Sequence, residues 1–249
     1  MVLDDEVVGE SLALKQVLAS AKRLAASDGA LLITGEPGSG KESIARAIHR
    51  MSARRNESFV NVYCVTSAGG LLERDLFGYE SGALDDAISD KASWLERADK
   101  GTLFLDEITR IPLDLQSKLF RVLKRREFER LGSARIIRVN VRLIAATKHD
   151  PEKIAGDRLH DDLHDQFETS SIQIPPLRER REDIPLLAHY FMQKFARRMN
   201  KDIEIIAPET MDALLNYDWP GNVAQLENFI QRSVILTDSC RLQAPLDEL

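Results

Sequence analysis

Two short segments of this sequence carry residue types that handle nucleotide phosphates. Residues 35–42 read Gly-Glu-Pro-Gly-Ser-Gly-Lys-Glu and match the pattern G-x-x-x-x-G-K. In such a loop, backbone N–H groups surround the phosphates, and the lysine, here Lys41, reaches the outer phosphates. Downstream, the apolar run Leu103–Leu105 ends in an acidic pair, Asp106 and Glu107. Together the two segments predict a nucleoside triphosphate site.

The flanks of the first segment support this interpretation. The apolar run Ala30–Thr34 precedes it, and the apolar residues from Ile44 to Ile48 follow with helical spacing. A strand, a loop and a helix in this order are the context that the motif requires. We therefore favour a phosphate loop over a plain glycine-rich turn. For the same reason we favour a catalytic role for Asp106 and Glu107 over an acidic turn at a strand end.

Strand and helix patterns alternate through the first two thirds of the chain, which predicts an α/β layer with a mainly parallel sheet. The expected strands are 30–34, 59–63, 102–105, 142–146 and 171–174, and the expected helices are 11–26, one ending near 51, 71–77 and 113–126. The segments 128–130 and 136–139 flank Gly132-Ser133 and predict a hairpin.

The character of the sequence changes after Pro175-Pro176. Helix patterns at 184–198, 208–217 and 222–236 follow, and no convincing strand pattern accompanies them. We therefore expect two parts. Residues 1–177 form an α/β nucleotide-binding subdomain, and residues 178–249 form a small helical subdomain.

Composition limits the possible partners and location of this chain. It has 249 residues, of which 30% are charged and 43% hydrophobic, and its net charge is −6. This balance is ordinary for a soluble protein and does not point to nucleic acid as a partner of this segment. No apolar run approaches the roughly 18 residues that a membrane span needs. Acidic residues follow Met1, and the two cysteines have no disulfide or zinc spacing, so we expect a cytoplasmic protein without a membrane contact.

The motifs occur in the order found in the AAA+ module of sigma-54-dependent bacterial transcription activators, and the chain resembles that family over nearly its whole length. The matching segments are Gly35–Glu42, Glu73–Glu80, Ala98–Glu107, Pro175–Arg180, Glu182–Ile184 and Trp219–Val223. The resemblance implies a three-layer parallel sheet followed by a small all-helical lid. It also implies a self-associating ring that hydrolyses ATP and remodels sigma-54 RNA polymerase. DNA contact would come from a domain that this chain lacks.

The same resemblance assigns roles to individual residues. ATP or ADP would be bound by Gly35, Glu36, Pro37, Gly38, Ser39, Gly40, Lys41, Glu42 and Thr147. Asp106 would hold Mg²⁺ through water, and Glu107 would polarise the attacking water. Glu42 stands where many phosphate loops have Ser or Thr, and the family also carries Glu there.

Several positions depart from the family pattern, beginning with the arginines. The family supplies arginine fingers to the neighbouring subunit from F-R-x-D-L-x-x-R-L, and this stretch has His160 and Gln166 in place of both arginines. An arginine finger is worth about 10³–10⁵ in turnover. The lid arginine of W-P-G-N-V-R is replaced by Ala224.

Other departures affect the switch and the contact loop. Tyr63 replaces the asparagine that holds the catalytic glutamate in a switchable state, and Lys148 stands where Asn or His is usual. A partial replacement of the lost cation by Lys148 is one alternative. The sigma-contacting GAFTGA loop reads Gly82-Ala-Leu-Asp-Asp-Ala87, which adds two negative charges and removes a glycine. This change argues against contact with sigma-54 polymerase.

These substitutions lead to three hypotheses. In the first, the chain binds ATP or ADP, hydrolyses it weakly or not at all, and assembles alone or in a mixed ring with a related activator. In the second, it is an active ring ATPase that remodels sigma-54 polymerase. In the third, it is a non-catalytic interaction scaffold.

Three further segments have alternative interpretations. His160 and His164 are spaced for zinc, but we prefer a solvated polar helix face. The basic stretch from Lys118 to Arg130 could contact DNA, but we prefer a subunit interface or a solvated face. The mixed charges of Arg178–Asp183 indicate a solvated linker that opens a helix.

Overall fold

The computed structural model describes residues 2–3, 7–64, 69–80, 91–153, 156 and 158–245. The sigma-contacting loop, Gly82–Ala87, therefore lies outside the described residues. The chain forms two compact units. The first, here called the loop–lid unit, contains Met1–Ala19, Gly35–Ser43 and Ile174–Leu249, and the second, the sheet unit, contains Ser20–Thr34 and Ile44–Gln173. The boundary near residue 177 stays a prediction, because the phosphate loop shares a unit with the C-terminal segment.

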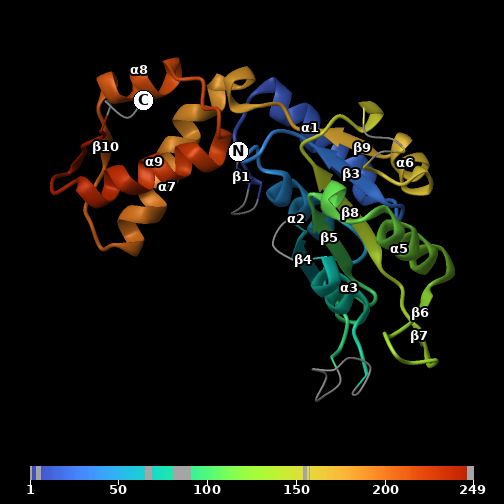
Figure 1. Ribbon diagram of the computed structural model, residues 1–249. Coiled ribbons are helices and arrows are strands. Elements are labelled where there is room, and N and C mark those ends of the chain that lie inside the picture. The colour runs from blue at the N-terminus through green and yellow to red at the C-terminus, as the bar shows by residue number, and fades with distance from the viewer. Residues whose placement is uncertain are drawn as a thin grey trace. The chain divides into compact units, whose positions relative to one another are not determined.

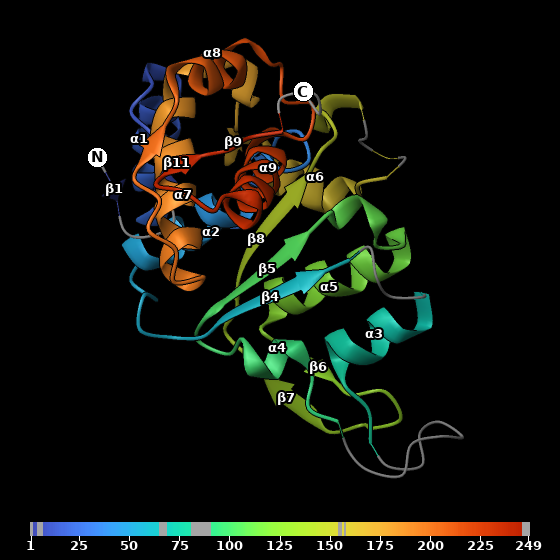
Figure 2. The same cartoon turned by 90° about the vertical axis from the view of Figure 1, so that its left-hand side faces the viewer.

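A five-stranded parallel sheet is the frame of the sheet unit (Figure 2), as the alternating patterns predict. Its order is β4 (Phe59–Tyr63), β5 (Thr102–Asp106), β8 (Arg142–Thr147), β3 (Leu31–Thr34) and β9 (Ser171–Gln173). Every neighbouring pair is parallel. Parallel strands place all their carboxyl ends at one edge, so Tyr63, Asp106 and Thr147 meet at the same edge of the sheet.

Alternation along the buried strands divides their side chains between two layers of helices. Leu32, Leu103 and Leu143 belong to a core with α3 (Gly69–Phe77), α4 (Trp94–Arg97), α5 (Leu113–Arg125) and α6 (Asp161–Glu168). On the other face, His49 of α2 (Lys41–Met51) contacts the ring of Phe59, which stacks on Phe104. Helices on both faces explain why these strands are apolar throughout.

Smaller elements complete the sheet unit. The hairpin β6 (Glu127–Glu129) and β7 (Ile136–Arg138) is antiparallel, as predicted. Helix α4 was not predicted, because four residues are too short to show a periodicity. Its signal is the capping box of Ser93 and Glu96, in which each residue bonds the backbone N–H of the other. Helix α1 (Leu12–Ala25) starts in the loop–lid unit and ends in the sheet unit.

The C-terminal part of the loop–lid unit is built from three helices around an apolar core. These are α7 (Ile184–Arg198), α8 (Pro208–Asn216) and α9 (Asn222–Leu236), and they match the predicted spans closely. Trp219 is fully buried in this core, and its indole N–H donates to the carbonyl of Leu214. The short strands β10 (Ile205–Ile206) and β11 (Arg241–Leu242) pair in parallel, a detail that the sequence did not predict because two residues carry no pattern.

Short turns and strands connect the rest of the loop–lid unit. Two 3₁₀ turns, η3 (Leu177–Glu179) and η4 (Arg181–Asp183), lead into α7, and β1 (Val2–Leu3) pairs with β2 (Val7–Val8) at the N-terminus (Figure 1). Asp183 is fully buried and accepts hydrogen bonds from the backbone N–H groups of Glu10 and Ser11 and from the Ser11 hydroxyl. The start of α1 is thereby bound to the turn that precedes α7.

Arg54 ties together the segments that enter the sheet unit's central strands. Its guanidinium donates to both carboxylate oxygens of Asp28, each at 3.0 Å, and to the carbonyl of Gly101 at 3.0 Å. It also donates to the backbone carbonyl and side-chain oxygen of Asn140, at 2.6 and 2.8 Å. Gly101 precedes β5 and Asn140 precedes β8, so one side chain fixes the amino ends of two neighbouring strands.

We predict that Arg54→Leu lowers the free energy of unfolding by about 2–4 kcal/mol, because buried carbonyls lose their donors. The matched control is Arg55→Leu, an exposed arginine at the next position, for which we expect a change within about 0.5 kcal/mol. Urea unfolding of both variants tests this prediction. Equal losses would show that the hydrogen bonds of Arg54 are not what stabilises these strands.

Candidate functional site

The backbone of the phosphate loop adopts a shape that glycine allows. Gly38 and Gly40 have φ of 73° and 103°, in the left-handed region that favours glycine. A Cβ on Gly38 would lie 2.3 Å from the carbonyl oxygen of Gly221, whereas a Cβ on Gly40 would meet no atom within 4 Å. Gly38 is therefore required by close packing as well as by conformation, and the space beside Gly40 is open.

Two polar side chains of the loop fit an anionic ligand. The Lys41 ammonium is largely buried and donates to the carbonyls of Gly35 and Glu36, at 2.9 and 3.1 Å. The Ser39 hydroxyl is buried and has no hydrogen-bond partner among the described residues. A buried hydroxyl without a partner is costly, so its presence in this loop fits a segment that receives phosphate oxygens.

The second residue of the loop, Glu36, is bound by the C-terminal segment. Arg178 donates to both of its carboxylate oxygens, at 2.9 and 2.7 Å, and Asn222 Nδ2 donates to one of them at 3.0 Å. These hydrogen bonds, that of Arg178 first and then that of Asn222, lower the pKa of Glu36 from 4.5 to about 2. Glu36 is thus held as a carboxylate across the neutral range.

The position of the missing lid arginine also lies at the phosphate loop. The backbone N–H of Ala224, in the first turn of α9, donates to the carbonyl of Gly38 at 3.3 Å. The side chain of Ala224 is exposed. An arginine at this position would start from the tip of the loop, so its replacement removes a positive charge there.

The acidic pair lies in the sheet unit, at the carboxyl end of β5. Asp106 pairs in register with Tyr63 of β4 and Ala146 of β8, and its carbonyl accepts from the N–H of Cys64 at 3.0 Å. Glu107 has φ 61° and ψ 57°, a left-handed conformation that is uncommon and costly for glutamate. A strained acidic residue at a strand end is typical of a functional site.

Two buried residues, Cys64 and Thr147, lie at the same strand edge as the acidic pair. Burial chiefly raises the pKa of the Cys64 thiol to about 12, and the negative charges of Asp106 and then Glu107 contribute. Thr147 is fully buried at the end of β8, and its hydroxyl accepts from the N–H of His149 at 3.1 Å. The side chain of Thr147 therefore lies at the strand edge that also carries the acidic pair.

The substituted residues at this edge are exposed. The ring of Tyr63 is 51% exposed, and Lys148, which directly follows β8, is exposed as well. Tyr63 lies opposite Asp106 in the β4–β5 ladder. An aromatic ring therefore stands beside the acidic strand end, where the family has a short amide.

The segment that aligns with the arginine fingers is rigidly placed. Gln116 of α5 is fully buried, and its Nε2 donates to the carbonyls of Ile111 and Arg158 while its Oε1 accepts from the N–H of His160. His160 then caps α6 through Nδ1, and Gln166 is exposed on the same helix. The frame that would present the fingers is present, although the arginines at 160 and 166 are absent.

The structure also bears on the three alternative readings. Among the described residues, no group of three or more His, Cys, Asp or Glu side chains is arranged to hold a metal. The polar helix face at His160 and His164 stays a prediction. The solvated-linker interpretation of Arg178–Asp183 is wrong for two residues, because Arg180 and Asp183 are buried. The buried residues serve as hydrogen-bonding partners of other segments, which a charge pattern alone does not reveal.

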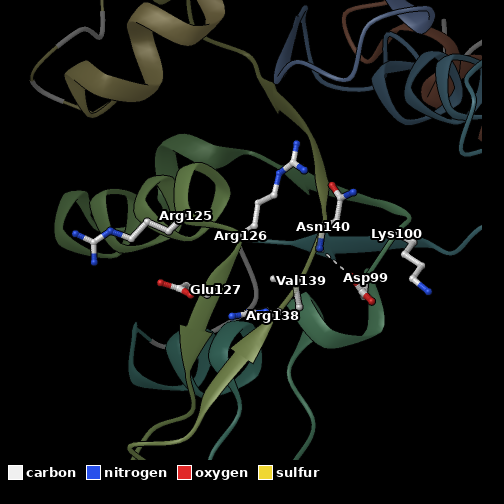
Figure 3. Close-up of a pocket in the computed structure, with 8 residues that line it drawn as sticks. All are labelled: Asp99, Lys100, Arg125, Arg126, Glu127, Arg138, Val139 and Asn140. Carbon is white, nitrogen blue, oxygen red and sulfur yellow. Dashed lines mark hydrogen bonds between the residues drawn. The ribbon is translucent and has the colours of Figure 1, made fainter.

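The basic stretch is divided between ion pairs and a hollow. Lys118 pairs with Glu73, and Arg130 pairs with Glu96. A hollow of about 370 Å³ lies at the amino ends of β5 and β8, opposite the edge of the acidic pair, and is lined by Asp99, Lys100, Arg125, Arg126, Glu127, Arg138, Val139 and Asn140. The charged heads of Arg125 and Arg126 point in different directions (Figure 3), so they do not converge on one ligand group.

Comparison with protein families decides the identity of the fold and module. The sigma-54 interaction domain matches residues 7–173, and the AAA+ ATPase lid domain matches residues 178–246. The chain belongs to the sigma-54 interaction domain family. This confirms the resemblance and the AAA+ fold that it implied. Among the described residues, no helix has the length and apolarity to cross a membrane.

Curated relatives are transcriptional activators of enterobacteria and other bacteria. The formate hydrogenlyase transcriptional activator FhlA of Escherichia coli is 49% identical over 245 residues, which are 98% of this chain and 35% of that protein. The transcriptional regulatory protein ZraR of Escherichia coli is 44% identical over 92% of this chain and 52% of its own length. The chain therefore spans about a third of the first relative and about half of the second.

Solved structures of NtrX from Brucella abortus have the same fold. The structure in complex with ATP has a TM-score of 0.87 and 38% identity, and it covers 97% of this chain and 54% of NtrX. The structure in complex with ADP has a TM-score of 0.86 at the same identity.

We predict that the contribution of Glu36 to stability depends on pH. Its folded-state pKa of about 2 lies below the ordinary 4.5, so the stabilisation is present above about pH 4.5 and is lost as the pH falls toward 2. Because the pair is exposed, we expect Glu36→Gln to cost less than about 1 kcal/mol near neutral pH. Chemical unfolding near pH 6 and near pH 3 should show a clearly smaller cost at the lower pH, whereas a cost independent of pH would contradict the prediction. The control is Glu204→Gln, an exposed glutamate in the same unit.

Proposed function

We propose that this chain is the ATP- or ADP-binding AAA+ module of a sigma-54-type transcriptional regulator, and that it hydrolyses nucleotide weakly or not at all. The observation that carries the proposal is a contrast. The phosphate loop has its glycines, its lysine and a buried hydroxyl that finds no partner in the described part of the chain, whereas the exposed positions 166 and 224 carry no arginine.

Nucleotide binding rests on the loop–lid unit. Backbone N–H groups of residues 35–42 would surround the phosphates, Lys41 would neutralise their charge, and Ser39 would donate its free hydroxyl. The NtrX structures named as complexes with ATP and ADP support the same ligand class for this chain. Thr147 would contribute from the end of β8, as the resemblance implies.

The acidic strand end offers the donor type that Mg²⁺ prefers. Asp106 and Glu107 supply carboxylate oxygens, which are hard ligands suited to this ion. Bound Mg²⁺ would offset the phosphate charge. Asp106 would hold the ion through water, and Glu107 would orient and polarise the attacking water.

The substitutions explain why turnover should be low. Gln166 is neutral and cannot stabilise the charge of a departing phosphoryl group, and His160 lacks the bidentate fork of arginine even when protonated. Since fingers act on a neighbouring subunit, each copy in a ring would weaken an adjacent site. Tyr63 would remove the amide contacts that set the catalytic glutamate.

The proposal includes assembly and location. The module would self-associate into a ring, or into a mixed ring with a related activator, in the cytoplasm of a bacterium. The two added aspartates at 85 and 86 argue against capture of sigma-54 polymerase by this chain. An active ring ATPase that remodels the polymerase, and a scaffold that binds no nucleotide, are the competing outcomes of the tests below.

We predict that the unaltered chain binds fluorescent ATP and ADP analogues, and that Lys41→Ala weakens ATP binding at least about tenfold, because the loop's cation is removed. The control is Lys15→Ala, an exposed lysine of α1 in the same unit. Fluorescence titration with Mg²⁺ measures both affinities, and phosphate release measured in parallel should be near the background rate. Rapid phosphate release would support the active-ATPase alternative, and no binding would support the scaffold.

We predict that Tyr63→Asn, Gln166→Arg and Ala224→Arg together raise ATP turnover by at least about tenfold, because an arginine finger typically raises turnover by a factor of about 10³–10⁵. All three positions are exposed, so the new side chains have room. Phosphate release by the assembled protein measures the effect, with the same triple variant carrying Glu107→Gln as the control. Unchanged turnover would place the defect elsewhere.

A further inference from the structure

Residues 36–39 form the tip of the phosphate loop. Each of them accepts a hydrogen bond from the C-terminal segment of the same unit. Glu36 accepts from Arg178 and Asn222. The carbonyl of Pro37 accepts from Asn222 Nδ2 at 3.1 Å, and that of Gly38 accepts from the N–H of Ala224 at 3.3 Å. Residues 36–38 of the loop are therefore all bonded to the C-terminal segment.

The fourth residue of the tip, Ser39, is bonded to a buried arginine. Arg180 Nη2 donates to the carbonyl of Ser39 at 2.7 Å, and the Arg180 side chain is only 5% exposed. Burial lowers the pKa of Arg180 while the charge of Asp183 raises it. The resulting contact places a cation directly behind the backbone of the loop.

Asn222 joins three segments through one amide. Its Oδ1 accepts from the N–H of Leu177 at 2.7 Å, and its Nδ2 donates to Glu36 and to the carbonyl of Pro37. The residue is fully buried, and its φ of 54° lies in the left-handed region that asparagine tolerates better than most residues. No other side chain of similar size offers a donor and an acceptor in this arrangement.

The same residue begins helix α9. Asn222 is the first residue of α9, and two positions later Ala224 bonds the carbonyl of Gly38. Gly38 has no space for a Cβ against Gly221. A shift of the loop tip must therefore move the first turn of α9, or break these bonds.

We propose that Asn222 is a positioning residue of the phosphate loop, which sets the loop for nucleotide and passes nucleotide occupancy to the start of α9. Position 224 is not an arginine in this chain. Asn222 and the backbone N–H of Ala224 would connect the phosphate loop to α9 instead. The inference rests on the proposed nucleotide binding and adds how that binding is communicated.

Asn222→Asp tests the role with little change of shape. The acceptor for Leu177 is kept, but a carboxylate oxygen replaces the donor and faces the Glu36 carboxylate and the Pro37 carbonyl. We expect affinity for a fluorescent ATP analogue to fall about tenfold or more. The control is Asn216→Asp, an exposed asparagine of α8 whose amide donates to the carbonyl of Asp212 in its own helix.

A polarity exchange separates positioning from a general loss of structure. In the double variant Glu36→Gln with Asn222→Asp, the amide of the new glutamine can donate to the new carboxylate. We expect this variant to regain at least about threefold in affinity over Asn222→Asp alone. Asn222→Gly, which keeps the left-handed backbone and removes the amide, should bind weakly and should not be rescued by Glu36→Gln.

Communication to α9 is read by hydrogen exchange of its first turn. At saturating ATP, residues 223–226 should exchange more slowly in the unaltered chain and should show no slowing in Asn222→Asp. If the unaltered chain binds ATP, and Asn222→Asp binds it with the same affinity and shows the same slowing of exchange, the inference is overturned and the proposed function stays intact. Absence of binding by the unaltered chain overturns both.

Discussion

A phosphate loop has a structural constraint that reaches beyond its ligand: its carbonyl oxygens need hydrogen-bond donors other than those of a regular helix or sheet. Here the donors come from distant parts of the chain, namely Asn222, Arg180 and the backbone of Ala224. The glycine at position 38 permits the close approach that these bonds require. The shape of the phosphate loop thus depends on residues outside it, and one compact unit contains both the loop and these residues.

The substitutions on which the proposed loss of turnover rests lie at positions where a change costs the fold little. Gln166, Ala224 and Lys148 are exposed, and Tyr63 is half exposed, so their replacement leaves the packing of the core unchanged. By contrast, Gln116, which positions the segment at His160, is fully buried. A module of this kind can lose its catalytic charges while its framework persists, because different residues carry the two properties.

The regular parts of the structure follow from local patterns. The apolar runs predicted all five sheet strands, and helical spacing predicted α7, α8 and α9 within one or two residues. Loop and acid motifs predicted the candidate site residues, whose roles stay predictions. The pattern could not reveal that Arg180 and Asp183 are buried, because charged residues near a proline pair normally indicate a solvated turn. It also missed Asn222 as a contact of the loop, since that bond joins residues far apart in the chain and depends on tertiary packing.

Burial, with a smaller contribution from the acidic strand end, determines which thiol of the chain can react. Thiol-directed reagents and oxidants attack the thiolate, and the Cys64 thiol, buried and beside two carboxylates, stays protonated at physiological pH. Cys240 is exposed, just before β11. Of the two cysteines of this chain, only Cys240 is therefore open to chemical labelling in the folded state, which gives the chain one attachment point just after α9 without any cysteine being removed.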